Sequence, residues 1–202
     1  MSASAVPRLL AVTPGDSRDL IPWLHALANV GWPGLLIREP HIPPEQLTGL
    51  VTFACERFEF VAVHARCPGW EDVVRKHPTI HLHVPDDPTM VPDATVHWGA
   101  SCHDITGLHH RFDAGAKYAL LSPVCAPTSK PEDVRPTTGI PRFLSIVHGL
   151  PHRRPLLALG GMNPARHHAL RAGGGHGSAV LGDLFNQPNP EAAARRACLY
   201  LP

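Results

Sequence analysis

The sequence has few aromatic residues, no long apolar run and no block of charge of one sign. Its 202 residues include six Phe, four Trp and two Tyr, and the formal net charge is +1. No stretch approaches the roughly 20 apolar residues that span a bilayer, and no basic block favours a nucleic-acid partner. The first residues, MSASAVPRLLAV, lack the basic start and apolar core of a signal peptide. We therefore expect a cytoplasmic protein without a membrane or nucleic-acid partner.

Cysteine is also sparse, and its spacing excludes the common cysteine frameworks. The chain has five cysteines, an odd number, and none forms a CxxC pair. We expect reduced thiols and no disulfide scaffold. With 44% hydrophobic residues the chain can bury a full core, and no linker of open composition divides it. We therefore predict a single domain over residues 1–202.

Short apolar runs alternate with segments of helical spacing along the whole chain. This alternation is typical of parallel strands joined by crossover helices. Eight such units predict a closed (β/α)8 barrel, with a doubly wound open sheet as the alternative. No GxGxxG follows the first run, which disfavours a dinucleotide-binding sheet. The predicted strands are 9–13, 34–38, 60–64, 79–83, 95–99, 117–121, 156–159 and 177–181.

Glycines end the last two predicted strands. Gly160 and Gly161 follow one apolar run, and Gly182 follows the next. Glycine lets an anion approach backbone N–H groups closely, and the loops after strands seven and eight are the usual phosphate site of such a barrel. These glycines could instead serve only to close tight turns. Because two such turns occur in tandem, we predict a phosphate site at Gly160, Gly161 and Gly182.

Polar side chains gather where the predicted strands end, which is where barrel enzymes carry their chemistry. Arg38 and Lys130 are cations suited to phosphate, although Arg38 could instead pair with Glu39 and Lys130 could be solvated. His81 and His83 share one face of a strand, so both are expected to point towards the barrel axis. A zinc site built from the rim His and Cys residues is disfavoured because their spacing matches no zinc motif. The paired histidines at 109–110 and 167–168 are expected at the surface.

Six segments together resemble the thiamine phosphate synthase and TenI superfamily, whose fold is a (β/α)8 barrel. Each segment is weak evidence alone, but their order and spacing are specific, and they cover nearly the whole chain. They are LLIREP (35–40), IHLHVPDDP (80–88), WGASCHD (98–104), YALLSPVCAPTSKP (118–131), LALGGMNP (157–164) and GSAVLGDLF (177–185).

The resemblance implies a role for several of these positions. The family's synthase joins hydroxymethylpyrimidine diphosphate to a thiazole phosphate and releases diphosphate with magnesium. Arg38 matches an arginine that contacts the diphosphate, and Asp86, preferred over Asp87, matches a magnesium ligand. Ser101 matches a serine near the pyrimidine. The remaining matches are Ser129 with the thiazole phosphate, Lys130 with the diphosphate, and Gly160, Gly161 and Gly182 with the phosphate cradle.

The chain also departs from the synthase pattern, chiefly on the diphosphate side. Leu36 and Pro40 stand where the synthases carry Gln and Lys, and Ala65 replaces a magnesium carboxylate. His83-Val84 replaces Gly-Gln. A preorganised diphosphate site needs several charges together, so the departures predict weak or absent synthase activity.

The leading hypothesis from the sequence is therefore a TenI-like thiazole tautomerase, an isomerase that needs no cofactor. Its usual catalytic histidine falls on Pro123, so His81, His83 or His103 would act as the base, with His81 preferred. The alternatives are a divergent synthase, which would use Mg²⁺, and a non-catalytic barrel. In each case the small-molecule partner is a phosphorylated heterocycle. The sequence leaves the oligomeric state open, with a homodimer as the candidate assembly.

Overall fold

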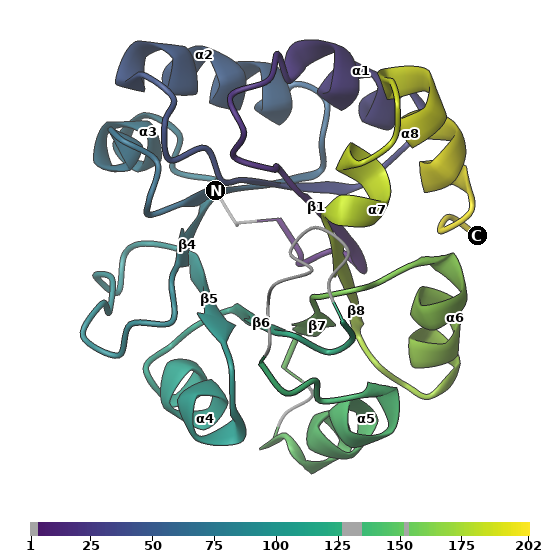
Figure 1. Cartoon of the computed structure of the whole chain (residues 1–202). Helices are drawn as coiled ribbons and strands as arrows, with labels where there is room; N and C mark the ends of the chain where they lie inside the picture. Colours follow the sequence, from purple (N-terminus) through teal and green to yellow (C-terminus); the bar gives the residue numbers. More distant parts are fainter. Residues whose placement is uncertain (1–3, 127–134, 152–153) are drawn as a thin grey trace.

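The computed structural model describes residues 4–126, 135–151 and 154–202. Eight parallel strands close into one barrel in chain order, β1 pairing with β2 and so on until β8 pairs with β1. Helices surround this ring (Figure 1). The prediction of a single-domain (β/α)8 barrel is confirmed. The strands are β1 (Leu9–Val12), β2 (Gly34–Ile37), β3 (Phe60–His64), β4 (His81–Val84), β5 (Trp98–Cys102), β6 (Tyr118–Leu121), β7 (Leu156–Ala158) and β8 (Gly177–Val180).

The helices follow the strands in turn, except between β4 and β5, where a loop makes the connection. Three helices begin with a side-chain cap, in which Asp104, Asn163 or Asn189 accepts a backbone N–H of the first turn. Proline within the first turn assists α1, α2, α5, α6 and α8. The helices are α1 (Ile21–Asn29), α2 (Pro44–Cys55), α3 (Trp70–Lys76), α4 (Ile105–Asp113), α5 (Ile140–Gly149), α6 (Pro164–Ala172), α7 (Gly182–Phe185) and α8 (Pro190–Cys198).

Two apolar layers hold the barrel together. A small inner layer fills the barrel axis, and its centre includes Phe60, Tyr118 and Leu120. A larger outer layer packs the strands against the helices and contains Ile80, Leu82 and Val84 of the β4 segment. The alternate β4 residues, His81 and His83, are buried and contact the rings of the inner layer. The prediction that both histidines point towards the axis is confirmed.

Two sequence expectations need correction. β4 and β5 both begin later than predicted, so Ser101 and Cys102 are the last two residues of β5 and do not lie in the loop after it. The apolar residues Trp98, Ala100 and Cys102 face the outer layer at period two, which extends the strand. His167 is buried and not at the surface, because its Nδ1 lies 3.0 Å from the Ser178 hydroxyl of β8.

None of the helices in the described ranges combines the length and apolar character needed to cross a membrane.

Candidate active site

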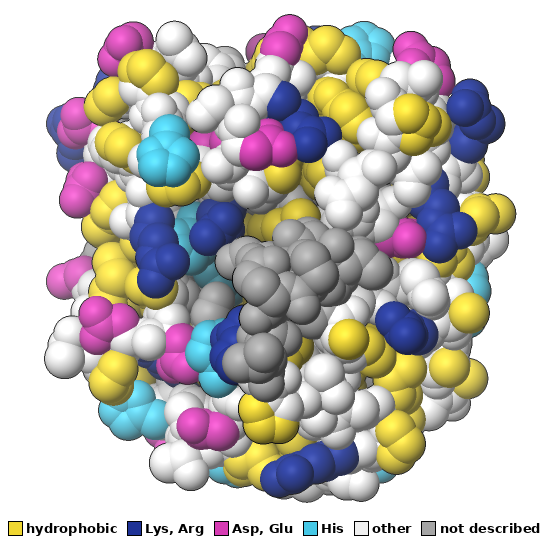
Figure 2. All heavy atoms as spheres, viewed as in Figure 1, with side chains coloured by type: hydrophobic (Ala, Val, Ile, Leu, Met, Phe, Trp, Pro, Cys, Tyr) yellow, Lys and Arg dark blue, Asp and Glu magenta, His cyan; other side chains and the backbone are white. Residues whose placement is uncertain are grey.

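A cavity of about 470 Å³ opens where the strands end and the loops to the following helices begin. The molecular face in Figure 2 shows Lys, Arg and His side chains gathered beside a hollow. The residues that line the cavity come from the ends of most strands, as expected for a barrel enzyme. Its polar and glycine lining includes Arg38, His64, Arg66, Asp86, Ser101, His103, Ser122, Arg135, Gly160, Gly161 and Gly182.

One part of the lining is cationic and centres on His64, the last residue of β3. Arg38 and Arg66 both lie close enough to disfavour the charged imidazole. Burial, with these two arginines, lowers the pKa of His64 to about 3, so the ring is neutral near pH 7. Its Nδ1 accepts the Arg66 N–H at 3.0 Å, which places the ring proton on Nε2. The result is a group of three hydrogen-bond donors with a net positive charge.

Arg38 is held by its backbone, and its guanidinium is left available. Its N–H donates to the Thr13 hydroxyl at 2.8 Å. No side-chain hydrogen bond or ion pair of Arg38 occurs with another described residue. Glu39 does not pair with Arg38; its carboxylate accepts the Gly15 N–H at 2.9 Å. This hydrogen bond ties the loops after β1 and β2 together. Burial raises the pKa of Glu39.

The glycine turn after β7 forms another part of the lining. Gly160 and Gly161 have φ angles of 99° and 57°, which favour glycine. They also pack tightly, since a Cβ on Gly161 would overlap the carbonyl oxygen of Ala126. The backbone N–H groups of both glycines donate no hydrogen bond to any described residue. The turn therefore closes a tight corner, and two donors without a partner among the described residues lie beside the cavity; the predicted phosphate site at this turn stays a prediction.

The chain after β8 is held against the C-terminal helix. Gly182 lines the cavity, and the next residue, Asp183, forms a bidentate pair with Arg196 of α8 at 2.7 and 2.9 Å. The Tyr200 hydroxyl also donates to Asp183 at 2.8 Å. Asp183 is therefore occupied by structural partners although it lines the cavity. Its role is to fix the position of Gly182 beside the glycine turn.

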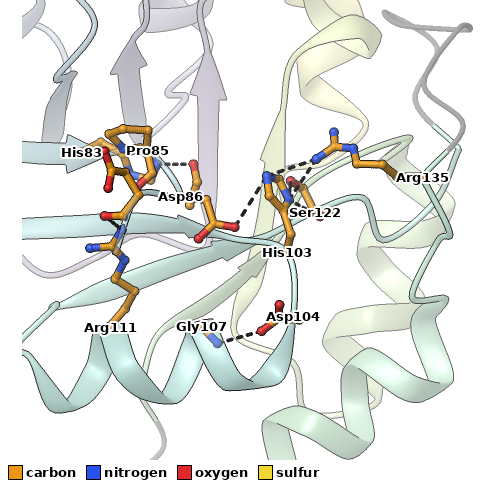
Figure 3. Close-up of polar contacts among 11 residues, drawn as sticks. His83, Pro85, Asp86, His103, Asp104, Gly107, Arg111, Ser122 and Arg135 are labelled. Carbon is orange, nitrogen blue, oxygen red and sulfur yellow. Dashed lines mark hydrogen bonds and ion pairs between the residues drawn. The ribbon is translucent and has the colours of Figure 1, made fainter. Parts of the chain in front are cut away.

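His103 lies between an acidic and a basic side chain at the cavity rim (Figure 3). Its Nε2 is 3.9 Å from a carboxylate oxygen of Asp86, and its Nδ1 is 2.7 Å from the Ser122 carbonyl oxygen. The guanidinium of Arg135 lies 3.0 Å from the same Nδ1. All three partners come from other loops remote in sequence from His103, which is why Arg135 was not predicted from the sequence.

Arg111 holds the β4–β5 loop that carries Asp86. Its side chain is 1% exposed and donates to the carbonyl oxygens of Met90, Pro85 and Asp87. These hydrogen bonds to the buried guanidinium thus hold a strand connection that contains no helix. Because three carbonyls of one loop converge on it, the loop has one position relative to α4, and Asp86 is held next to His103.

The two β4 histidines, His81 and His83, are not among the residues that line the cavity. His81 packs against Phe60 with a ring separation of 4.5 Å, and its Nδ1 has no hydrogen-bond partner among the residues that the structure describes. Burial lowers its pKa to about 4. His83 bonds to Tyr118 and Ser101. Their predicted role as catalytic bases stays a prediction, and the cavity geometry favours His103 and His64 as the histidines that meet a ligand.

The remaining predicted site residues are distributed as follows. Arg38, Ser101, Gly160, Gly161, Gly182, Asp86 and His103 all line one cavity. Ser129 and Lys130 lie outside the described residues, so their predicted roles stay predictions. Arg66 follows β3 in the sequence but was given no role there. Its position at a strand end was the signal that could have identified it.

The described residues fit a magnesium site poorly. Asp86 is the one carboxylate in the described lining without a short ion pair, because Asp16 is paired with Arg18 and Asp183 with Arg196. Within the described ranges, no group of three His, Cys, Asp or Glu side chains could hold a metal. The role of Asp86 as a magnesium ligand therefore stays a prediction, and we derive no reaction step through a metal.

Comparison with known proteins decides the family. The model of the thiamine monophosphate synthase family matches residues 9–184, which is most of the chain. The chain belongs to this family. The thiamine-phosphate synthase of Bordetella pertussis is 35% identical over 103 residues, 50% of this chain and 47% of that protein. The bifunctional protein ThiM/ThiE of Symbiobacterium thermophilum is 34% identical over 105 residues, 52% of this chain and 21% of that protein.

Solved structures support the fold of this thiamine monophosphate synthase family member. Thiamine phosphate pyrophosphorylase from Pyrococcus furiosus superposes with a TM-score of 0.76 at 17% identity, covering 96% of this chain and 93% of that one. 3-Hexulose-6-phosphate synthase superposes with a TM-score of 0.68 at 16% identity, covering 96% and 100%. At such identities the similarity establishes the barrel alone. The sequence matches span about half or less of the curated relatives, so they leave substrate and activity open.

Proposed function

We propose that this chain is a transferase of the thiamine-phosphate synthase type, which joins hydroxymethylpyrimidine diphosphate to a thiazole phosphate. The observation that carries the proposal is the pairing of two anion-binding elements in one cavity. Arg38 and Arg66 form one element, and the open N–H groups of Gly160 and Gly161 form the other. A reaction between two phosphorylated substrates requires two such elements, whereas binding a single phosphate requires one.

The cationic element suits the diphosphate. An arginine guanidinium binds two phosphate oxygens at once, and such charge-assisted hydrogen bonds are roughly twice as strong as neutral ones. The neutral His64 adds an Nε2–H donor beside Arg38 and Arg66. As the bond between the methylene carbon of the pyrimidine substrate and the diphosphate oxygen breaks, and the thiazole ring nitrogen becomes bonded to that carbon, negative charge grows on the departing oxygen. Fixed donors at this place would stabilise that charge.

The glycine turn suits the thiazole phosphate. Free backbone N–H groups bind phosphate oxygens without adding side-chain bulk. Gly182, held through Asp183 by Arg196, borders the same space. A thiazole phosphate anchored here would extend towards Ser101 and His103 across the cavity. The two substrates would then meet above the strands, where Asp86 and Ser122 also lie.

The structure favours this transferase over the tautomerase that we preferred from the sequence. The Bordetella pertussis relative carries the name thiamine-phosphate synthase. The preferred base of the tautomerase, His81, is buried next to Phe60 and is not part of the cavity lining. Leu36 and Ala65 supply no polar group to the diphosphate. We therefore expect turnover well below that of synthases that keep those contacts.

The test is a coupled assay with both substrates. Purified protein, hydroxymethylpyrimidine diphosphate, thiazole phosphate and Mg²⁺ should yield thiamine phosphate and diphosphate in equal amounts, measured by chromatography. The Bordetella pertussis synthase provides the positive control. Arg38→Ala should lower kcat/KM by about 10- to 100-fold through lost charge-assisted hydrogen bonds.

The matched control is Arg142→Ala, which removes an exposed arginine of α5 that does not line the cavity. This variant should keep wild-type kcat/KM. Failure of the wild-type protein to form thiamine phosphate above the rate without protein would refute the proposed function. Equal losses in both arginine variants would refute the specific role of Arg38.

A further inference from the structure

A chain of three hydrogen-bonding side chains leads from the barrel interior to the cavity. The Tyr118 hydroxyl lies 3.0 Å from Nδ1 of His83, and Nε2 of His83 lies 3.0 Å from the Ser101 hydroxyl oxygen. Tyr118 and His83 are both 0% exposed, whereas Ser101 is half-buried and lines the cavity. The two buried residues, Tyr118 and His83, therefore determine whether the Ser101 hydroxyl donates or accepts a hydrogen bond at the cavity.

The hydrogen positions in this chain follow from satisfying each buried group. Among the described residues, His83 is the sole hydrogen-bond partner of the Tyr118 hydroxyl. If Nδ1 of His83 carried the proton, the buried phenol hydrogen would have no acceptor, which costs about 1 to 3 kcal/mol. The hydroxyl of Tyr118 must therefore donate to Nδ1. The single proton of the neutral ring is then on Nε2 and is donated to Ser101.

The surroundings keep His83 neutral and in place. Burial lowers its pKa well below the ordinary value, and nearby His64 and Arg111 act in the same direction. The Tyr118 ring occupies the space beside Gly99, where a Cβ would overlap the ring. The His83 ring lies between the rings of Tyr118 and His64, each 5.5 Å away. The His83 ring is therefore packed against both neighbouring rings, and burial disfavours its charged form.

We propose that Tyr118 and His83 are positioning residues that make the Ser101 hydroxyl an obligatory hydrogen-bond donor to the substrate. The Ser101 oxygen already accepts from His83, so its own hydrogen must point elsewhere, and the cavity is the open direction. The substrate atom that meets the Ser101 hydrogen is then an acceptor, such as a ring nitrogen or a carbonyl or phosphate oxygen. The link to a substrate rests on the proposed function, whereas the hydrogen positions do not.

The hydrogen positions can be measured on the wild-type protein without any ligand. Long-range ¹H–¹⁵N spectra of the histidine rings distinguish a protonated Nε2 from a protonated Nδ1. Through-space contacts with the rings of Tyr118 and His64 would assign the His83 signals. We expect one signal set from pH 6 to 8, with Nε2 protonated and Nδ1 accepting a hydrogen bond. A protonated Nδ1, or a ring protonated at both nitrogens, would overturn the proposal.

Binding of hydroxymethylpyrimidine diphosphate, measured by calorimetry, tests the consequence for the ligand. Ser101→Ala should weaken binding by about two- to tenfold, the effect of one lost hydrogen bond. Tyr118→Phe should weaken it by a smaller factor, because His83 loses its fixed tautomer and Ser101 can then donate to Nε2. In the Ser101→Ala background, Tyr118→Phe should have no further effect, since no hydroxyl is left to orient.

The matched control is Tyr200→Phe, which removes the other tyrosine hydroxyl, bonded to Asp183 and Met162. It should leave the His83 signals unchanged. Additive losses from Tyr118→Phe and Ser101→Ala would show a merely structural role for Tyr118 and would refute the orienting role. A protein that makes no thiamine phosphate but shows the expected tautomer would refute the proposed function and support this hydrogen-bond chain.

Discussion

Replacing Gly161 with alanine should disrupt both the stability and the anion site, for reasons that can be calculated from the backbone. The φ angle of 57° is in the left-handed region, where a Cβ costs about 1 to 2 kcal/mol. The added Cβ would also lie 3.0 Å from the Cys125 carbonyl carbon and overlap the carbonyl oxygen of Ala126. Because those atoms belong to the backbone, the turn or the facing loop must move. This movement lowers the stability by a further amount of about 1 to 3 kcal/mol.

The expected total is a loss of about 2 to 5 kcal/mol in the free energy of unfolding. For a chain of this size, each kcal/mol corresponds to about 2 to 4 °C in Tm, so Gly161→Ala should lower Tm by roughly 4 to 20 °C. The displaced N–H groups should also bind phosphate less well. Calorimetric unfolding and titration with inorganic phosphate would measure the two effects, and we expect at least about a tenfold loss of phosphate affinity, as for one or more charge-assisted hydrogen bonds.

Gly49 provides a control for which the expected sign is opposite. It lies within α2, is exposed, and a Cβ there would have nothing within 4 Å. Gly49→Ala should therefore raise the stability by about 0.5 to 1 kcal/mol, since alanine is the better helix former. If Gly161→Ala were as stable as Gly49→Ala and bound phosphate as well as the wild type, the assignment of the glycine turn would be wrong.

Three further measurements test other parts of the structure. Burial lowers the pKa of His64 to about 3 and those of His81 and His167 to about 4; below the unfolded pKa of about 6.5 the unfolded chain binds more protons. The free energy of unfolding should therefore fall as the pH drops below about 6.5, by up to about 2 kcal/mol per histidine at pH 5. Equal urea midpoints at pH 7 and pH 5 would contradict this. Arg111→Met should leave three buried carbonyls without a partner and lower the stability by at least about 3 kcal/mol, so a Tm within about 2 °C of wild type would exclude this role. Arg38→Ala should weaken diphosphate binding by about 10- to 100-fold, and an unchanged titration isotherm would remove Arg38 from the diphosphate site.

The alternation of apolar runs with helical segments was sufficient to predict the barrel and its order. Most strands are buried on both faces and read as short apolar runs. Side chains such as Asn163 and Asp104 mark helix starts locally. The residues at strand ends, among them Arg38, Ser101 and Gly160, were also identified, because parallel strands place their carboxyl ends at one face of a barrel. The strands, the helix starts and the strand-end residues can be predicted because they depend on residues adjacent in the sequence or on the two-residue period of a strand.

Which of the predicted residues line the cavity was decided only by the tertiary structure. Sequence periodicity shows that His81 and His83 share a face, but it does not show depth along the barrel axis. Phe60 and Tyr118, from other strands, cover those histidines, while His103 reaches the rim.

Hydrogen-bond partners were likewise beyond the sequence, because they join segments far apart in the chain. Arg111 binds carbonyls more than 20 positions away, and Tyr118 lies 35 positions from His83. The sequence by itself determined the eight strands, their order and the end of the barrel that carries the polar residues. The closure of the barrel decided which side chains are buried, which are already paired and which remain free for a ligand, because burial and pairing depend on residues that only folding brings together.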